Sequence, residues 1–197
     1  LVACLPRRGL DGSSLSPRTG RDVVAVGQYG PAERRGHRFT EALVRIGGVS
    51  QLMIEVSDAD SAQSALTTAE RILNDGKLLG MYPEGTRSPD GRLYKGKTGL
   101  ARLALESDVP VIPVAMIGTD VVNPPGSKMW RFGRVTVKFG KPMDFSRFEG
   151  LAGNRFIERA VIDEVMYELM RMSGQEYVDL YAADVKDGKA ELTAKPS

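Results

Sequence analysis

Apolar residues between positions 57 and 73 recur every three or four residues, which is the spacing of one face of an α-helix. Asp58 and Asp60 can cap the first turn, and Gly76 follows the last turn, where glycine accepts a left-handed backbone without a Cβ clash. The pattern therefore predicts an amphipathic helix that ends in a glycine turn. The residues expected to face inward are Ala62, Ala65, Leu66, Ala69, Ile72 and Leu73.

The chain after this helix alternates between strand-like and helix-like patterns. Residues 78–82 and 109–118 are short, almost uninterrupted apolar runs, as in strands that are covered on both faces. Residues 97–106, which lie between them, have helical spacing. Pro110 and Pro113 limit ladder hydrogen bonding, so we expect the second strand near a sheet edge or with an irregular start.

Two further elements complete the pattern. Residues 134–140, RVTVKFG, alternate with the two-residue period of a half-buried strand, and residues 154–172 have the spacing of a long helix. The resulting order of helix, strand, loop, helix, strand, strand and helix indicates a single-domain α/β sandwich. The inward positions expected in the last helix are Ile157, Ala160, Val161, Val165, Leu169 and Met172.

Composition separates the beginning of the chain from the rest. Residues 1–50 contain eight arginines and no lysine, whereas the later sequence mixes both. We therefore divide the chain into an atypical amino-terminal part at 1–56, a core at 57–182, and a flexible polar tail at 183–197. The net charge of +2 argues little by itself. No stretch of about 18 apolar residues is present, so any membrane contact is expected to be peripheral. Cys4 is the only cysteine, which fits a reducing, cytoplasmic compartment.

Two candidate phosphate-binding patterns follow the first predicted strand. Residues 91–98 satisfy the nucleotide-loop pattern G-x-x-x-x-G-K-[ST]. Such a loop must follow a buried strand directly, but residues 83–90, PEGTRSPD, intervene with two prolines and two acids. A triphosphate would be repelled by these acids, so the pattern is more typical of a turn followed by a basic helix start.

The other pattern is PEGTRS at residues 83–88. Gly85 allows close backbone approach, Thr86 and Ser88 supply hydroxyls, and Arg87 supplies a planar fork that suits phosphate. Glu84 is unfavourable beside a bare phosphate unless it accepts hydrogen bonds from substrate hydroxyls or orients Arg87. The combination therefore favours a polyol phosphate such as glycerol phosphate, and the alternative is a solvated turn with an incidental ion pair.

The stretch LLGMYPEGTRSPDGRLYKGKTGLARLALESDVPVIPVAMIGTD resembles two sequence blocks of the glycerolipid acyltransferases, specifically the 1-acyl-glycerol-3-phosphate acyltransferase family. The similarity runs from about residue 61 to 181. It implies an α/β fold with a mixed sheet flanked by helices. It also implies a role in phospholipid biosynthesis, in which a fatty acyl group moves from acyl-CoA or acyl carrier protein to the free hydroxyl of 1-acyl-glycerol-3-phosphate. No metal or bound cofactor is implied, and the enzyme would lie at the inner membrane face. The implied substrate-binding residues are Glu84, Gly85, Thr86, Arg87, Ser88, Lys95 and Lys97.

The catalytic block of that family, His-x-x-x-x-Asp, has no match here. The only histidine is His37, and Ala42 stands five positions later, so we assign no catalytic residue. Val56 stands where the family usually carries a phosphate-binding arginine. Two explanations are open. The first, which we favour, is that the first part of the chain is non-native through truncation, a displaced reading frame or a misplaced start. The second is that the chain is a diverged family member that has lost the catalytic chemistry. The alternatives to an enzyme are a non-catalytic lipid-phosphate-binding protein and a P-loop nucleotide-binding protein. We expect no nucleic-acid partner because the arginines are not interleaved with aromatics.

Overall fold

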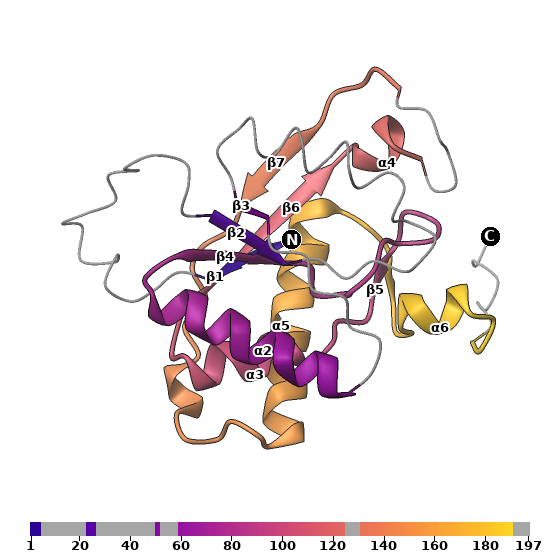
Figure 1. Cartoon of the computed structure of the whole chain (residues 1–197). Coiled ribbons are helices and arrows are strands. Elements are labelled where there is room, and N and C mark those ends of the chain that lie inside the picture. The colour runs from indigo at the N-terminus through magenta and orange to yellow at the C-terminus, as the bar shows by residue number, and fades with distance from the viewer. Residues whose placement is uncertain (5–22, 27–49, 52–58, 125–130, 191–197) are drawn as a thin grey trace.

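The computed structural model describes residues 1–4, 23–26, 50–51, 59–124 and 131–190. Six strands form one sheet in the order β3-β2-β4-β1-β6-β7 (Figure 1). Their bounds are β1 Val2–Cys4, β2 Val23–Val26, β3 Ser50–Gln51, β4 Leu78–Met81, β6 Val111–Ile117 and β7 Thr136–Phe139. β2 is parallel to β3 and β4, whereas β1 pairs antiparallel with β4 and β6, and β6 with β7. The expected mixed sheet is confirmed.

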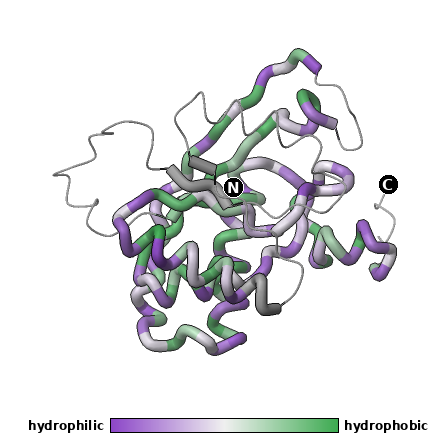
Figure 2. Tube along the Cα trace, in the orientation of Figure 1, coloured by the Kyte–Doolittle hydropathy of each residue, from purple (hydrophilic) through white to green (hydrophobic). Residues whose placement is uncertain are grey.

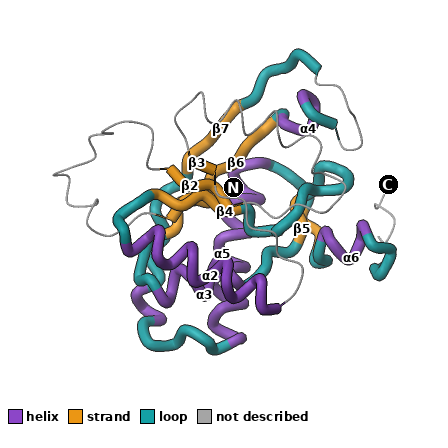
Figure 3. The backbone as a smooth tube through the Cα atoms, viewed as in Figure 1, coloured by secondary structure: helices purple, strands orange, loops and turns teal. Residues whose placement is uncertain are grey.

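Three helices pack together against the sheet and form the core with it (Figures 1 and 3). They are α2 (Ala59–Asn74), α3 (Gly99–Glu106) and α5 (Arg155–Ser173). Each carries hydrophobic and hydrophilic residues in alternation along its path, which is the expected pattern for helices buried on one side (Figure 2). Within the described residues, no helix is both long enough and apolar enough to cross a bilayer.

Helix α2 follows the prediction closely. Ala65, Ala69, Ile72 and Leu73 are buried, and Leu66 packs against the same core. The helix is followed by Gly76 at φ +75°, the left-handed conformation that the sequence predicted there. The side chain of Ala62 lies outside the described residues.

Helix α5 is partly different from its prediction. Its inward face contains the expected Val161, Val165 and Leu169, but also Ile162 and Met166, which the pattern missed. Ala160 was predicted to face inward and is exposed. The buried face is wider than a single stripe because α5 contacts both α3 and the sheet. The start of the helix is well defined, since the side chain of its cap Asn154 accepts the N–H of Phe156 at 3.0 Å.

The strand predicted at 109–118 is β6, and its prolines fit a position one strand from the edge. β6 lies between β1 and the edge strand β7. Pairing with β7 begins at Val114, and on that side Pro113 contributes its carbonyl, which accepts the N–H of Gly140 at 2.8 Å. Proline is tolerated at this point because its carbonyl continues the pairing although it has no N–H to donate.

Strand β7 exists where the alternation predicted it, but the predicted half-burial is wrong. All four of its residues are exposed, and Phe139 is 74% exposed. Alternation predicts a strand with two unlike faces, but whether one face is covered depends on what packs against it. Lys138 shows which face the helices approach, because its Nζ donates to the carbonyl of Met172 in α5 at 3.1 Å. Phe139 points to the other face.

The remaining elements are not strands of this six-stranded sheet. They are α4 (Thr119–Val122), the 3-10 helix η3 (Ser146–Phe148), and a small parallel pair, β5 (Leu93–Tyr94) with β8 (Tyr177–Val178). Helix α6 (Ala182–Lys186) follows β8, and Ala182 is fully buried. The sequence assigned 183–197 to a polar tail, but residues 183–186 belong to α6 and residues 187–190 follow in hydrogen-bonded turns.

Candidate functional site

The PEGTRS loop leaves the carboxyl end of β4 and turns immediately. The N–H of Gly85 donates to the carbonyl of Tyr82 at 3.1 Å, and Gly85 adopts φ +74°. A side chain at this position would be strained, so the glycine is required by the turn rather than only by a ligand. The turn brings residues 84–88 to the outside of the sheet.

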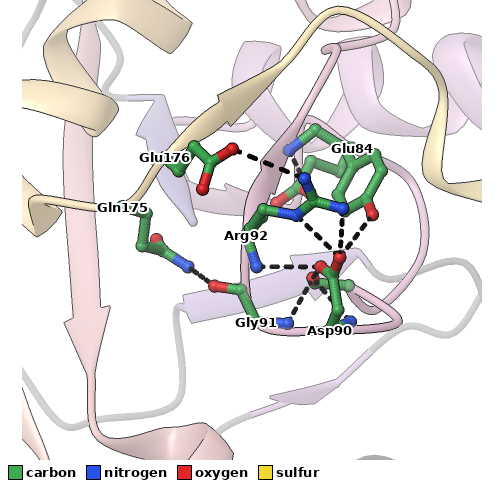
Figure 4. Close-up of polar contacts among 8 residues, drawn as sticks. Glu84, Asp90, Gly91, Arg92, Gln175 and Glu176 are labelled. Atoms are coloured by element: carbon green, nitrogen blue, oxygen red, sulfur yellow. Dashed lines mark hydrogen bonds and ion pairs between the residues drawn. The ribbon is translucent and has the colours of Figure 1, made fainter. Parts of the chain in front are cut away.

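Glu84 ties this loop to the next strand. Its Oε2 accepts the backbone N–H of Tyr94 in β5 at 2.9 Å (Figure 4). Burial raises the pKa of Glu84 to about 7, while the Tyr94 N–H, the α-amino group of Leu1 and the charge of Lys186 favour the ionised form. The carboxyl therefore changes charge near neutral pH at the centre of the candidate site.

Arg92 is the hub of a polar network in the turn that follows (Figure 4). Its Nε and Nη2 lie 2.7 and 2.6 Å from Oδ2 of Asp90, and its Nη1 lies 3.4 Å from Glu176. The Tyr94 hydroxyl donates to the same Asp90 oxygen at 3.0 Å. Burial alone would raise the pKa of Asp90, but the hydrogen bonds from Arg92 and Tyr94 outweigh it and lower that pKa. The network places two carboxylates around one guanidinium and fixes the turn to the segment that contains Glu176.

Ser88 builds the same turn. Its hydroxyl oxygen accepts the N–H of Gly91 at 2.9 Å, and it lies 3.3 Å from Oδ1 of Asp90. In the structure its hydroxyl orders the turn, and substrate binding by this serine stays a prediction.

The nucleotide-loop alternative requires backbone N–H groups that point at phosphate. Here the N–H groups of residues 91–97, except that of Gly96, donate to protein acceptors. Examples are Leu93 to the Glu176 carbonyl at 2.9 Å and Lys97 to the Pro83 carbonyl at 2.8 Å. The segment also contains a strand, β5, in place of an anion-binding loop. The P-loop interpretation of residues 91–98 is therefore wrong.

Gly96 is held against helix α5. A Cβ placed on it would lie 2.7 Å from Cγ1 of Ile162, and its carbonyl accepts Nη1 of Arg159 at 2.8 Å. These contacts fix the path of the chain between Lys95 and Lys97, so the two lysines emerge from a rigid support.

Lys95 and Lys97 have different surroundings. Nζ of Lys95 lies 2.8 Å from Oδ1 of Asp179 and 5.9 Å from the centre of the Tyr181 ring. The side chain of Lys97 is exposed, yet nearby protein atoms desolvate its ammonium and lower its pKa. The negative charge of Asp184 has the opposite, smaller effect on that pKa. Lys95 is thus held in an ion pair, whereas the ammonium of Lys97 lies in a partly desolvated environment near the charge of Asp184.

Thr86 and Arg87 form the outer part of the loop. Arg87 is exposed, as a guanidinium that meets a solute anion must be. Oγ1 of Thr86 accepts Nζ of Lys186 from helix α6 at 2.9 Å. Lys186 was not predicted, because nothing in a lysine-bearing polar tail indicates where its side chains will lie. The loop, Lys97 and Lys186 are brought together only by the fold.

A segment near the carboxyl terminus supports the same region. Nε2 of Gln175 donates to the Gly91 carbonyl at 2.6 Å, beside the ion pair of Glu176 with Arg92 (Figure 4). Neither residue was identified as part of the site from the sequence. His37, considered for the catalytic block, and Val56, which stands where the family carries a phosphate-binding arginine, lie outside the described residues. Among the described residues, no group of three or more histidine, cysteine, aspartate or glutamate side chains could hold a metal ion.

The fold and the loop define an α/β protein with a basic, hydroxyl-bearing turn at the carboxyl end of a buried strand. The family model named Acyltransferase matches residues 30–117. The match begins inside the segment 1–56 that composition sets apart and includes β4, the PEGTRS loop, α3 and β6. Over these residues the chain is similar to the acyltransferase family.

Several named proteins are similar to part of this chain. A 1-acyl-sn-glycerol-3-phosphate acyltransferase from Limnanthes alba is 36% identical over 94 residues, which are 47% of this chain and 34% of that protein. The protein of the same name from Haemophilus influenzae is 35% identical over 80 residues, or 41% of this chain and 32% of that protein. The crystal structure of PlsC, the 1-acyl-sn-glycerophosphate acyltransferase from Thermotoga maritima, has a TM-score of 0.44 and 21% identity, with 78% of this chain and 68% of that one covered. The match thus spans about a third of the length of these curated relatives.

Proposed function

We propose that this protein is an acyltransferase of phospholipid biosynthesis whose acceptor is 1-acyl-glycerol-3-phosphate. The observation that carries the proposal is the loop after β4. This loop contains Thr86 and the exposed Arg87, and it is hydrogen bonded to the segment that carries Lys97. The backbone bond from Lys97 to Pro83 joins these parts. The matched relatives are named for this acceptor, which supports the same assignment.

The reaction needs a general base and a site that holds the acceptor. The acceptor hydroxyl attacks the thioester carbonyl, a C–O bond forms, the C–S bond breaks, and the thiolate leaves and takes up a proton. The hydroxyl proton passes to a general base. The loop contributes by holding the acceptor's phosphate through charge-assisted hydrogen bonds, which positions the hydroxyl. The donor is a thioester of coenzyme A or acyl carrier protein.

Acyl transfer itself is the direct test. Lysophosphatidate and oleoyl-CoA, or the acyl carrier protein thioester, are incubated with the chain, and phosphatidate and free thiol are quantified. Product that depends on both substrates is expected of an intact enzyme. Failure of the chain to bind lysophosphatidate at all would overturn the proposal, because acceptor binding is the part that the described residues supply.

Arg87 gives a residue-level test of the same proposal. Arg87→Ala removes the guanidinium, so the acceptor KM, or the Kd where turnover is absent, is expected to rise about tenfold. The value of kcat should fall less, because the lost contact is made with both the substrate and the transition state. Arg155→Ala, at an exposed arginine that opens α5, is the matched control. An acceptor KM equal to that of the wild type would count against the assignment.

A second candidate is a non-catalytic lipid-phosphate-binding protein on the same fold. It is favoured by the absence of a His-x-x-x-x-Asp block, since the single histidine, His37, is followed by Ala42 at the aspartate position. Binding to vesicles that contain lysophosphatidate, without consumption of thioester, would select this candidate. For either function we propose peripheral contact with the inner membrane face, where such lipids reside.

A further inference from the structure

The chain from 174 to 186, which we call the return segment, folds back along strand β5. The N–H groups of Leu93 and Lys95 donate to the carbonyls of Glu176 and Leu180, at 2.9 and 3.0 Å. This parallel pairing continues from the turn at the start of β5 to its end. The return segment is therefore a fixed part of the region that surrounds the PEGTRS loop.

The return segment changes the charge of that region. Asp179 pairs with Lys95 at 2.8 Å, and the charge of Asp184 acts on Lys97. These two lysines were expected to attract the phosphate. Because acids of the return segment face both of them, their net attraction for an anion is reduced. A further cation is needed if the loop is to hold a doubly charged phosphate.

Lys186 adds a cation to this region, and its charge also acts on the carboxyl of Glu84. Its Nζ lies 2.9 Å from Oγ1 of Thr86, the residue that precedes Arg87. An ammonium group can only donate, so the threonine oxygen is the acceptor in this contact and its own hydroxyl hydrogen is directed elsewhere. The ammonium of the exposed Lys186 thus lies at the hydroxyl of Thr86, and the next residue along the loop is the exposed Arg87.

We propose that Lys186 is a substrate-binding residue that, with Thr86 and Arg87, holds the phosphomonoester of the acceptor. This inference rests on the proposed function and adds to it a cation from outside the matched family segment. A free phosphate ion and a lipid headgroup present the same group, so both can occupy the site. The return segment is then the element that completes the phosphate site.

Binding to the full chain tests the inference. Inorganic phosphate, glycerol 3-phosphate and micellar lysophosphatidate are titrated by NMR or calorimetry against the wild type and variants. Lys186→Ala is expected to weaken all three about tenfold, because a charge-assisted hydrogen bond is lost. Lys186→Arg should retain binding, while Lys186→Gln, which can still donate to Thr86 but is neutral, should weaken it as alanine does.

Lys189→Ala is the matched control, because Lys189 is an exposed lysine three residues away that pairs with Asp187. Equal binding by the wild type and Lys186→Gln would overturn the inference, since a purely structural contact would survive that change. A loss confined to the micelles would also overturn it, because it would assign Lys186 to the lipid surface. If Arg87→Ala weakens binding and Lys186→Ala does not, this inference fails alone. If the wild type binds none of the three ligands, the proposed function fails with it.

Discussion

Glu84 is the residue whose environment differs most from what its place in a loop suggests. A glutamate after a strand is usually solvated, but this one is partly buried and accepts a backbone N–H. Because its pKa is raised to about 7, the carboxyl of Glu84 stays protonated in the folded protein over a pH range in which it is ionised in the unfolded chain, where its pKa is 4.5. The buried carboxyl is therefore tolerated when neutral and unfavourable when ionised.

Stability should accordingly fall as the pH rises. The contribution of Glu84 is fully present below pH 4.5 and is lost as the pH rises through about 7. Between pH 5 and 8 we expect Glu84→Gln, which keeps a hydrogen-bond acceptor, to gain about 2 kcal/mol in free energy of unfolding relative to the wild type. Urea denaturation at the two pH values measures the difference.

Comparing the wild type with Glu84→Gln separates the contribution of the Glu84 carboxyl to stability from that of the titratable groups around it. Burial lowers the pKa of the Leu1 α-amino group to about 6, which gives the opposite slope with pH and is present in both proteins. Lys186 and Asp90 also act on Glu84 and are unchanged by the substitution. Glu149→Gln, at an exposed glutamate, controls for the loss of a charge. A pH dependence that is the same in Glu84→Gln and the wild type would rule out this origin.

At the scale of elements, the connection from β6 to α4 depends on one glycine. Gly118 adopts φ +86°, and a Cβ there would lie 2.4 Å from the carbonyl oxygen of Arg134. The obstacle is backbone of the neighbouring chain segment, which cannot rotate away as a side-chain end can. The segment that leads into β7 is thus packed directly against this turn.

Gly118→Ala should destabilise the protein by about 3 kcal/mol, the combined result of left-handed strain and the clash. Gly153 provides a matched control, since it has φ +87° and a Cβ added there would meet no atom within 4 Å. Gly153→Ala should cost only about 1 kcal/mol, from the strain alone. Thermal or urea unfolding of both variants measures this, and equal losses would show that the contact with Arg134 is absent.

The elements themselves were largely predictable. The helices α2, α3 and α5 and the strands β4, β6 and β7 all occur where periodicity placed them, with ends shifted by one to a few residues. Periodicity is a local property, which is why it carries this information. The burial of β7 was wrong because it depends on neighbours in space, and β5 was missed because two residues are too short to show a period.

At the scale of the whole molecule, the first strand is the least expected feature. β1 lies in the middle of the sheet between β4 and β6, although the sequence set residues 1–56 apart. Val2 and Cys4 are fully buried in the common core. Whether the rest of 1–56 is native to the fold stays a prediction, but these first residues complete the sheet.

Cys4 makes the position of β1 measurable. Burial raises the pKa of its thiol to about 12, so the reactive thiolate is suppressed as well as inaccessible. Labelling with a thiol reagent at pH 8 should be at least about a thousandfold slower in the native protein than in urea. Because the chain has only one cysteine, the rate reports on this strand alone. Rapid labelling of the native protein would place β1 outside the sheet, and Cys4→Ser gives the background.

Residues close along the chain were enough to predict the longer helices and strands and the turn at Gly76, because these features depend on local spacing. Tertiary structure decided which charged groups meet. All N–H groups of 91–97 except that of Gly96 donate to protein acceptors, such as the carbonyls of Pro83 and Glu176, and Lys186 contacts Thr86, which lies 100 residues before it. Pairings of this kind follow from the packing of separate elements, and no local pattern encodes them.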